Sequence, residues 1–170
     1  MNKTIVVSAV VVLGLFSLMW WSKPTTTPVD GSNANTNSNP ETKNALTAEE
    51  KLYDFGTISM ANGKVTKVFK VTNSASEDIT IKNIETSCMC TTAYLETASG
   101  EKGPFGMPGH GGGTTKTNEI VKAGESRELK VIYDPNAHGP AGVGTIDRFI
   151  YLTEGSGSIL ELEIKAEVTP

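Results

Sequence analysis

The residues that can bind metals or carry thiol chemistry are few and fall in three short segments. Two cysteines, Cys88 and Cys90, form one C-x-C pair, and two histidines, His110 and His138, lie in separate Gly-rich stretches. Met107 precedes His110 by three residues in GMPGHGGG. Thiolate, thioether and imidazole ligands together favour a soft or borderline ion, Cu(I) first and Zn²⁺ second. We therefore predict one metal site built from Cys88, Cys90, Met107, His110 and His138.

The spacing of the cysteines leaves other roles open. On an extended strand, residues two apart point to the same face and lie about 6.6 Å apart, which suits two thiolates on one ion. That separation is at the upper limit for a disulfide, although a β-bulge between the cysteines would allow one. The pair can also serve as small buried hydrophobic residues or in thiol redox chemistry. For His138, we expect Asp134 to accept a ring N–H and orient the imidazole.

A catalytic role is the weaker interpretation. Cys90, His138 and Asp134 contain a nucleophile, a base and an orienting carboxylate. However, the sequence has no G-x-S-x-G, Walker-type, H-E-x-x-H or C-x-x-C motif. The Gly-rich stretch 109–113 also lacks the lysine and the following helix that phosphate binding requires. We expect no enzymatic activity, no catalytic residues and no organic cofactor.

Composition indicates a single acidic domain rather than two domains. Of 170 residues, 38% are hydrophobic and 20% are charged, and 19 acidic against 15 basic side chains give a net charge of -4. Nucleic-acid surfaces need clustered positive charge, so we expect no nucleic-acid partner. Two cysteines are too few for a small fold held together by disulfides.

Residues 1–23 are predicted to be a membrane anchor. Nineteen uncharged residues separate Lys3 from Lys23. At about 1.5 Å per residue a helix of this length spans about 28 Å, close to the roughly 30 Å hydrocarbon core. The segment ends in Trp20 and Trp21, which favour the membrane interface, and it lacks an A-x-A cleavage pattern. We expect an uncleaved single-pass anchor with the rest of the chain outside the cytoplasm; a cleaved signal peptide is the alternative.

A polar segment follows the anchor over residues 24–47. Fifteen of the 23 residues from 24 to 46 are Thr, Ser, Asn or Pro. Such a segment cannot bury enough apolar area to offset the entropy lost on ordering it. We therefore expect a flexible linker over 24–47 that holds a folded domain, residues 48–170, near the membrane.

The folded domain is predicted to be all-β. In ILELEIKAEV, at residues 159–168, apolar and charged residues alternate with the period of a strand that buries one face. Further strand-like runs lie at 52–58, 64–72, 78–87, 128–135 and 148–153. Because no helical pattern interrupts them, we expect an antiparallel β-sandwich of about seven strands. The predicted core residues are Phe69, Val71, Ile79, Ile81, Leu129, Val131, Leu160, Leu162 and Ile164.

Several of these segments resemble a bacterial family. YDFGTI at 53–58, SCMCT at 87–91, KAGE at 122–125 and YDP at 133–135 follow one another as in the bacterial domain-of-unknown-function family 1573. The resemblance implies an immunoglobulin-like module related to hydin and major sperm protein domains, secreted or membrane-anchored, with no enzymatic activity. The Gly-rich stretch at 99–118 departs from the family pattern, so the resemblance does not explain its role.

Three functions are compatible with these patterns. The first, which we favour, is a membrane-anchored module that binds a soft metal ion such as Cu(I). The second is a non-catalytic module that contacts another envelope protein through a sheet face or an edge strand, with structural cysteines. The third is a participant in thiol–disulfide exchange.

Overall fold

The computed structural model describes residues 44–110 and 113–170, which form ten strands and two short 3-10 helices. The strands are β1 (Leu46–Ala48), β2 (Leu52–Ser59), β3 (Val65–Asn73), β4 (Ile79–Thr86), β5 (Thr91–Thr97), β6 (Gly100–Phe105), β7 (Lys116–Val121), β8 (Ser126–Tyr133), β9 (Gly144–Glu154) and β10 (Ile159–Thr169). The helices are η1 (Met60–Asn62) and η2 (Gly139–Gly142). The predicted anchor, 1–23, and most of the predicted linker lie outside the described residues. In the part that the structure describes, no helix is both long and apolar enough to cross a membrane.

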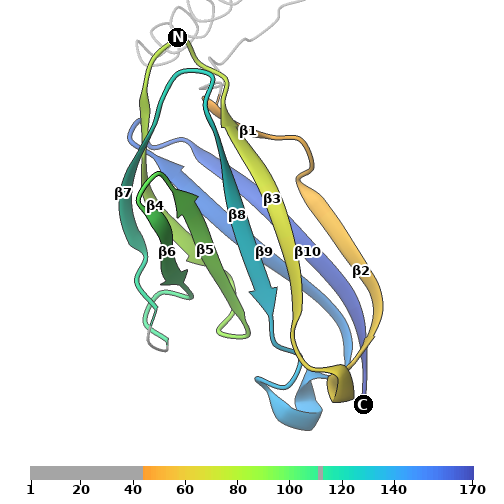
Figure 1. The fold of residues 1–170 in the computed structure, drawn as a ribbon. Coiled ribbons are helices and arrows are strands. Elements are labelled where there is room, and N and C mark those ends of the chain that lie inside the picture. Colours follow the sequence, from red (N-terminus) through yellow and green to blue (C-terminus); the bar gives the residue numbers. More distant parts are fainter. Residues whose placement is uncertain (1–43, 111–112) are drawn as a thin grey trace, which may run out of the picture. The chain divides into compact units, whose positions relative to one another are not determined.

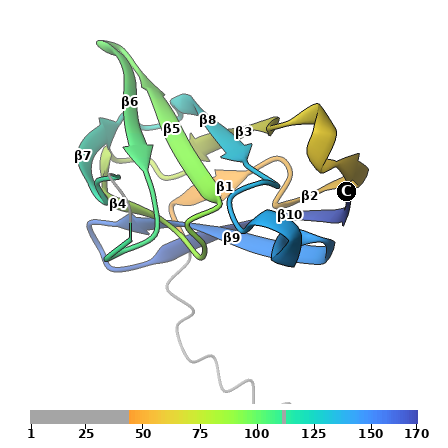
Figure 2. The same cartoon turned by 90° about the horizontal axis from the view of Figure 1, so that it is seen from below.

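The strands form two five-stranded sheets that pack face to face (Figures 1 and 2). The first, called here the β8 sheet, has the order β1-β3-β8-β5-β6, and the second, the β9 sheet, has the order β2-β10-β9-β4-β7. The predicted all-β class is therefore confirmed. Two details differ: the described chain has ten strands rather than about seven, and β2 pairs with β10 in parallel, so the β9 sheet is mixed.

The core forms where the inward side chains of the two sheets meet. In β10, alternate residues from Leu160 to Val168 are buried, and the hairpin register sets Leu162 opposite Ile150 of β9. Burying one such aliphatic side chain stabilises the fold by roughly 1.5–3 kcal/mol. Every predicted core residue is buried except Ile79, which is partly buried and packs against the same cluster.

The strands missed by the sequence prediction lack a strong apolar alternation. In β5 the inward residues include Thr91 and Thr97, which are buried although polar. The strand β6 and the start of β7 fall inside the Gly-rich stretch 99–118. Because β6 is an edge strand, it tolerates Pro104, which has no N–H to donate to a neighbouring strand.

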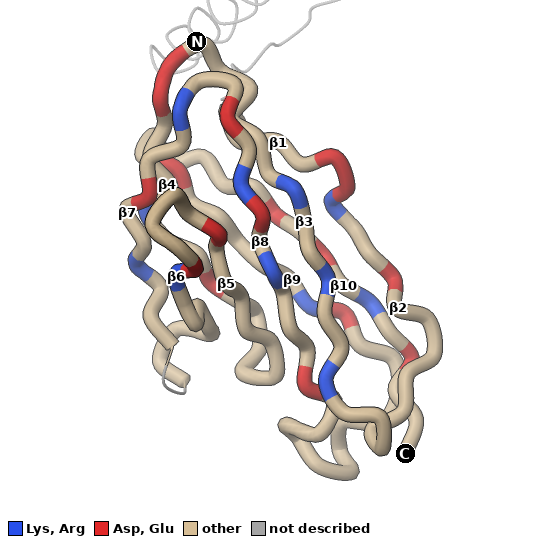
Figure 3. The backbone as a smooth tube through the Cα atoms, viewed as in Figure 1, with Lys and Arg blue, Asp and Glu red and all other residues tan. Residues whose placement is uncertain are grey.

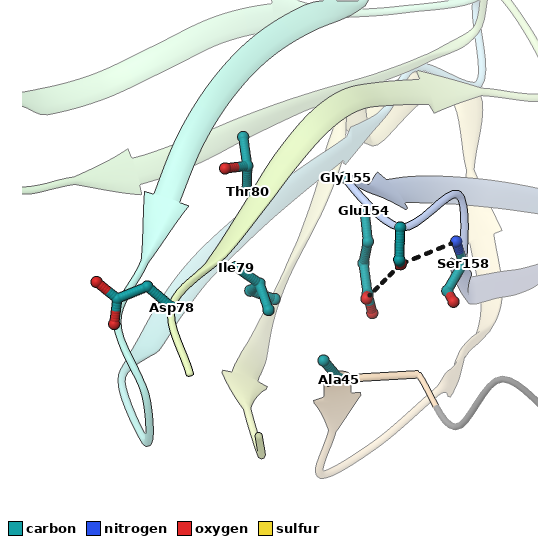
Figure 4. A pocket seen from close by; sticks show the side chains of 8 residues that line it. Ala45, Asp78, Ile79, Thr80, Glu154, Gly155 and Ser158 are labelled. Atoms are coloured by element: carbon teal, nitrogen blue, oxygen red, sulfur yellow. Dashed lines mark hydrogen bonds between the residues drawn. The ribbon is translucent and has the colours of Figure 1, made fainter. Parts of the chain in front are cut away.

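The first strand begins within the segment predicted as linker, because Leu46 and Thr47 form part of β1. Leu46 is only 1% exposed, and its backbone N–H donates to Oε1 of Glu154 at 2.8 Å. The hydroxyl of Ser156 donates to the other carboxylate oxygen at 3.2 Å. Figure 4 shows the Glu154 side chain directed towards the start of β1. This buried carboxylate therefore attaches β1 to the end of β9.

Three connections between the sheets lie together at the end of the sandwich opposite the start of β1, the lower end in Figure 1. They are the β4–β5 turn, the β6–β7 connection and the β8–β9 connection that contains η2. Charged residues lie mainly along the strands, whereas these loops contain few of them (Figure 3). The sandwich therefore presents mostly neutral loops at this end, and all five predicted ligands lie in them.

Candidate metal site

Cys88 and Cys90 lie in a tight turn. The strand β4 belongs to the β9 sheet and β5 to the β8 sheet, so residues 87–90 must cross from one sheet to the other. The N–H of Thr91 donates to the carbonyl of Cys88 at 3.1 Å, and the hydroxyl of Thr86 donates to the same carbonyl at 3.0 Å. The prediction that both cysteines extend from one face of a strand end is wrong, because the change of sheet requires a turn.

His138 reaches this turn from the β8–β9 connection. The N–H of Asp134 donates to the carbonyl of Cys90 at 2.9 Å, which ties the two connections together. The Asp134 carboxylate then accepts the N–H of Asn136 at 2.9 Å, so the chain folds back on itself. As a result, Nε2 of His138 lies 3.2 Å from Sγ of Cys88.

Three of the five predicted ligands therefore converge. The sulfur atoms of Cys88 and Cys90 and a ring nitrogen of His138 all lie within 4.8 Å of one another. Cys90 is 2% exposed, Cys88 is partly buried and His138 is exposed. Both thiols are free. The group can hold one small ion that reaches it from the solvent side, through His138 and Cys88.

His110 is not part of this group, and the structure places Met107 beside His110 in the lining of a separate pocket. Met107 and His110 line a pocket of about 240 Å³ that Met89, the residue between the two cysteines, also lines. The predicted hydrogen bond from His138 to Asp134 is also not formed. In the described residues, the Asp134 carboxylate instead accepts the Asn136 N–H and pairs with Lys64, whose Nζ lies 3.6 Å from Oδ2.

Arg148 is not among the ligands predicted from the sequence, and its side chain completes the site. Its Nε donates to Sγ of Cys90 at 3.3 Å. Arg148 lies in β9 in the same alternation as the buried Ile146 and Ile150, so its side chain starts from the inward face of the strand. A charged residue in the inward phase of a strand usually has a buried partner, because an unpaired buried charge is costly. That phase is the sequence signal that could have identified Arg148.

The surroundings give the two thiols different acidities. Burial raises the pKa of Cys88, but hydrogen bonds from Cys90 and His138 and the charge of Arg148 together lower it to about 7. Burial and the neighbouring Cys88 raise the pKa of Cys90, against the opposing hydrogen bond from Arg148. The first thiolate therefore forms on Cys88, the more exposed of the two sulfurs, close to neutral pH.

Comparison with known families agrees with the resemblance found in the sequence. Residues 46–106 match the family described as "Protein of unknown function (DUF1573)". The match spans the segment from β1 to the end of β6. It contains both cysteines, whereas His138 and Arg148 lie beyond the matched residues. None of the curated proteins compared with this chain matches it.

Solved structures show similarity at the level of the fold. A protein of unknown function from Porphyromonas gingivalis W83 is 15% identical with a TM-score of 0.52, and the match covers 72% of this chain and 46% of that protein. PapD-like domain 7 of human CEP192 is 10% identical with a TM-score of 0.47, and the match covers 81% of this chain and 96% of that domain. The secreted serine protease VesC of Vibrio cholerae is 14% identical with a TM-score of 0.47, covering 76% of this chain and 25% of the protease. At 15% identity, the match to the Porphyromonas gingivalis protein shows a shared fold and nothing more.

Proposed function

We propose that this protein is a membrane-anchored, extracytoplasmic and non-catalytic β-sandwich module that binds one Cu(I) ion through Cys88, Cys90 and His138. The observation that carries the proposal is the convergence of the three ligand atoms within 4.8 Å of one another. Two thiolates and one imidazole make a soft ligand set, which Cu(I) prefers. Structural Zn²⁺ sites almost always have four protein ligands, whereas this group supplies three.

The charge of Arg148 supports the choice of a monovalent ion. Two thiolates and one Cu(I) leave a single net negative charge, which the guanidinium next to Cys90 neutralises. With Zn²⁺ the ligands and the ion would already be neutral, and the charge of Arg148 would remain without a counter-charge. An uncompensated charge in a partly buried site is costly. The net charge of the ligands, the ion and Arg148 is therefore zero with Cu(I) and positive with Zn²⁺.

The pKa of Cys88 supports binding at neutral pH. A metal displaces protons from its thiol ligands, so a high thiol pKa weakens the apparent affinity. With a pKa of about 7, Cys88 is largely deprotonated in a weakly alkaline solution before the ion arrives. Only Cys90, whose pKa is raised, must lose its proton mainly on binding.

An anaerobic titration of the reduced full-length protein with Cu(I), in competition with a chromophoric Cu(I) chelator, tests the proposal. The wild type is expected to take one Cu(I) from the chelator, and the Cys88→Ser/Cys90→Ser variant is expected to lose this tightly bound ion. The control is Glu161→Ala, which removes an exposed carboxylate from β10 and should leave the titration unchanged. Equal retention of Cu(I) by the wild type and the double variant would contradict the proposal.

The proposed location rests on the 19-residue uncharged segment and is tested separately. N-terminal sequencing of the mature protein should give a sequence that begins before Lys3, and protease added to spheroplasts should degrade the C-terminal domain. A mature chain that begins near residue 23 or later would mean that the segment is a cleaved signal peptide and not an anchor. Protection of the C-terminal domain would reverse the orientation.

Thiol–disulfide exchange is a second candidate, and the lowered pKa of Cys88 beside a free Cys90 favours it. In that case the Cys90→Ser variant should accumulate mixed disulfides at Cys88, and the reduced wild type should hold no Cu(I). If neither Cu(I) binding nor mixed disulfides are found, the remaining function is an interaction module of the cell envelope in which the cysteines are structural.

A further inference from the structure

We propose that Met89, Met107 and His110 form a second Cu(I) site, which binds more weakly than a thiolate site. These residues carry two thioethers and an imidazole, and all three line the same pocket of about 240 Å³. Of the three methionines in the described residues, only Met60 lies elsewhere, in η1. The proposal stands on this pocket and does not require metal binding by the cysteines.

The backbone places Met107 and His110 side by side. The sequence Met-Pro-Gly-His at 107–110 forms a four-residue turn, in which the N–H of His110 donates to the carbonyl of Met107 at 3.2 Å. Gly109 has φ +76°, and Pro108 precedes it, as in a type II turn. Such a turn holds the first and fourth Cα atoms within about 7 Å of each other. The two side chains can therefore face one ion without any rearrangement of the strands.

The third ligand comes from the cysteine turn. Met89 is 51% exposed, which is a large exposure for an apolar side chain. It lines the pocket from the β4–β5 turn, whereas Met107 and His110 line it from the β6–β7 connection. A flexible, unbranched thioether can reach an ion in the pocket by rotation of its side chain alone. The fixed turn and the movable Met89 together provide three ligands.

The hydrogen bonding of His110 leaves one ring nitrogen available. Nδ1 of His110 lies 3.3 Å from the carbonyl oxygen of Pro108. The tautomer with the proton on Nδ1 donates to this oxygen, and Nε2 then carries the free lone pair that a metal needs. The turn that pairs His110 with Met107 therefore also prepares the imidazole as a ligand.

The ligand types define the chemistry of the site. Thioethers are soft and neutral, so they select Cu(I) and do not hold Zn²⁺ or Mg²⁺ well. Without a thiolate, the site should bind Cu(I) more weakly than the cysteine site does. If the cysteines bind Cu(I), a step that rests on the proposed function, Met89 links the weak site to the tight one through a single turn.

Nuclear magnetic resonance of methionine methyl groups tests the second site directly. The full-length Cys88→Ser/Cys90→Ser protein, labelled with ¹³C in the methionine methyl groups, is titrated with Ag(I) as a redox-inert probe for Cu(I). We expect one equivalent to shift the Met89 and Met107 signals and leave Met60 unchanged. Unchanged Met89 and Met107 signals, or an equal shift at Met60, would overturn the proposal.

Stoichiometry separates the two sites. The variant Met89→Leu/Met107→Leu/His110→Gln nearly conserves side-chain volume, so it should fold. In a direct titration without a competing chelator, which also fills the weaker site, we expect two Cu(I) ions on the wild type and one on this triple variant. We expect one on Cys88→Ser/Cys90→Ser and none when all five changes are combined. If the triple variant still binds two ions, the second site is wrong. If it loses one ion while the cysteine variant loses none, the second site stands and the proposed function fails.

Discussion

Cys88 and Cys90 are two residues apart, yet their surroundings predict different reactivities. The pKa of Cys88 is about 7, because hydrogen bonds from Cys90 and His138 and the charge of Arg148 outweigh the effect of burial. Cys90 is buried and its pKa is raised. In the reduced, metal-free protein, alkylation of Cys88 by iodoacetamide should therefore rise with pH around a midpoint near 7, while Cys90 reacts much more slowly. Mass spectrometry of the two modified positions gives both rates.

His138 provides the control for this prediction. Its Nε2 lies 3.2 Å from the Cys88 sulfur and stabilises the thiolate. The variant His138→Gln should move the midpoint for Cys88 towards the ordinary cysteine value of about 8.5. A midpoint near 8.5 in the wild type, or equal rates at the two cysteines, would show that this arrangement does not control thiol acidity.

The contact between Arg148 and Cys90 predicts a specific effect on metal affinity. A hydrogen bond to a charged group contributes about 1.5–3 kcal/mol, so Arg148→Met should weaken Cu(I) binding by about tenfold or more. Zn²⁺ binding should weaken less, because the neutral zinc–dithiolate unit does not need the guanidinium. Competition titrations with both ions measure the two changes. Lys82→Met, which removes a cation bound to Gly155 in the β9–β10 turn, should alter neither affinity.

Part of the site could be predicted from residue types alone. Cys88, Cys90 and His138 were selected because such side chains are scarce in this chain, and the structure brings these three together. Spacing could not show that residues 87–90 turn between the sheets, because an i, i+2 pair fits both a strand and a turn. The inward phase of Arg148 in β9 indicates that it has a buried partner, but alternation along one strand does not show that this partner is Cys90.

At the level of elements, the alternation in β10 makes a direct prediction about stability. Leu162 is fully buried, whereas Glu161 faces solvent. Leu162→Ala should lower the free energy of unfolding by about 2–5 kcal/mol, through lost burial and the cavity left behind. Glu161→Ala should change it by less than about 0.5 kcal/mol. Urea unfolding of both variants measures the difference, and equal losses would mean that the inward face of β10 is assigned wrongly.

The attachment of β1 makes a second prediction at this level. Glu154 accepts the N–H of Leu46 at 2.8 Å in a buried position. Glu154→Ala leaves that N–H without a partner, which costs about 1–3 kcal/mol. Hydrogen exchange at the Leu46 amide should accelerate more than exchange at Leu162 in the centre of β10. Glu154→Gln retains an acceptor oxygen and should have a smaller effect; an unchanged Leu46 rate in Glu154→Ala would exclude the attachment.

The sequence predicted strands well where apolar residues alternate cleanly and poorly where they do not. The strands β3, β8 and β10 have this alternation and were located to within a few residues. The strand β6 and the start of β7 fall in a stretch rich in glycine, where local propensity indicates a loop. The parallel pairing of β2 with β10 also could not be predicted, because alternation along one strand carries no information about the direction of its neighbour.

For the molecule as a whole, the position of the candidate sites relative to β1 matters. The ligand-bearing loops lie at the end of the sandwich opposite the start of β1 (Figure 1). Glu154 and its pocket, lined also by Ala45 and Asp78, are near the start of β1. Stability contributed by β1 and metal binding by the loops therefore depend on separate sets of contacts. Mutations far apart without shared partners usually have additive effects.

This separation predicts the behaviour of two truncated proteins. A protein of residues 44–170 keeps β1, the Glu154 hydrogen bond and every proposed ligand, so its melting temperature and Cu(I) stoichiometry should match those of the full-length protein. A protein of residues 49–170 lacks β1. It loses the buried Leu46 side chain and leaves β3 as an unpaired sheet edge, and we expect a loss of about 2–5 kcal/mol from the side chain alone.

The second truncation should nevertheless keep its metal affinity at temperatures where it remains folded. The strand β1 contacts β3 near Asn73, whereas the cysteine turn is held by Asp134 and the threonines at 86 and 91, at the other end of the sheets. Thermal unfolding combined with a Cu(I) competition titration at low temperature measures both properties on the same samples. A markedly weaker Cu(I) affinity in the folded 49–170 protein would contradict this prediction. It would mean that β1 and the metal site are coupled through the core.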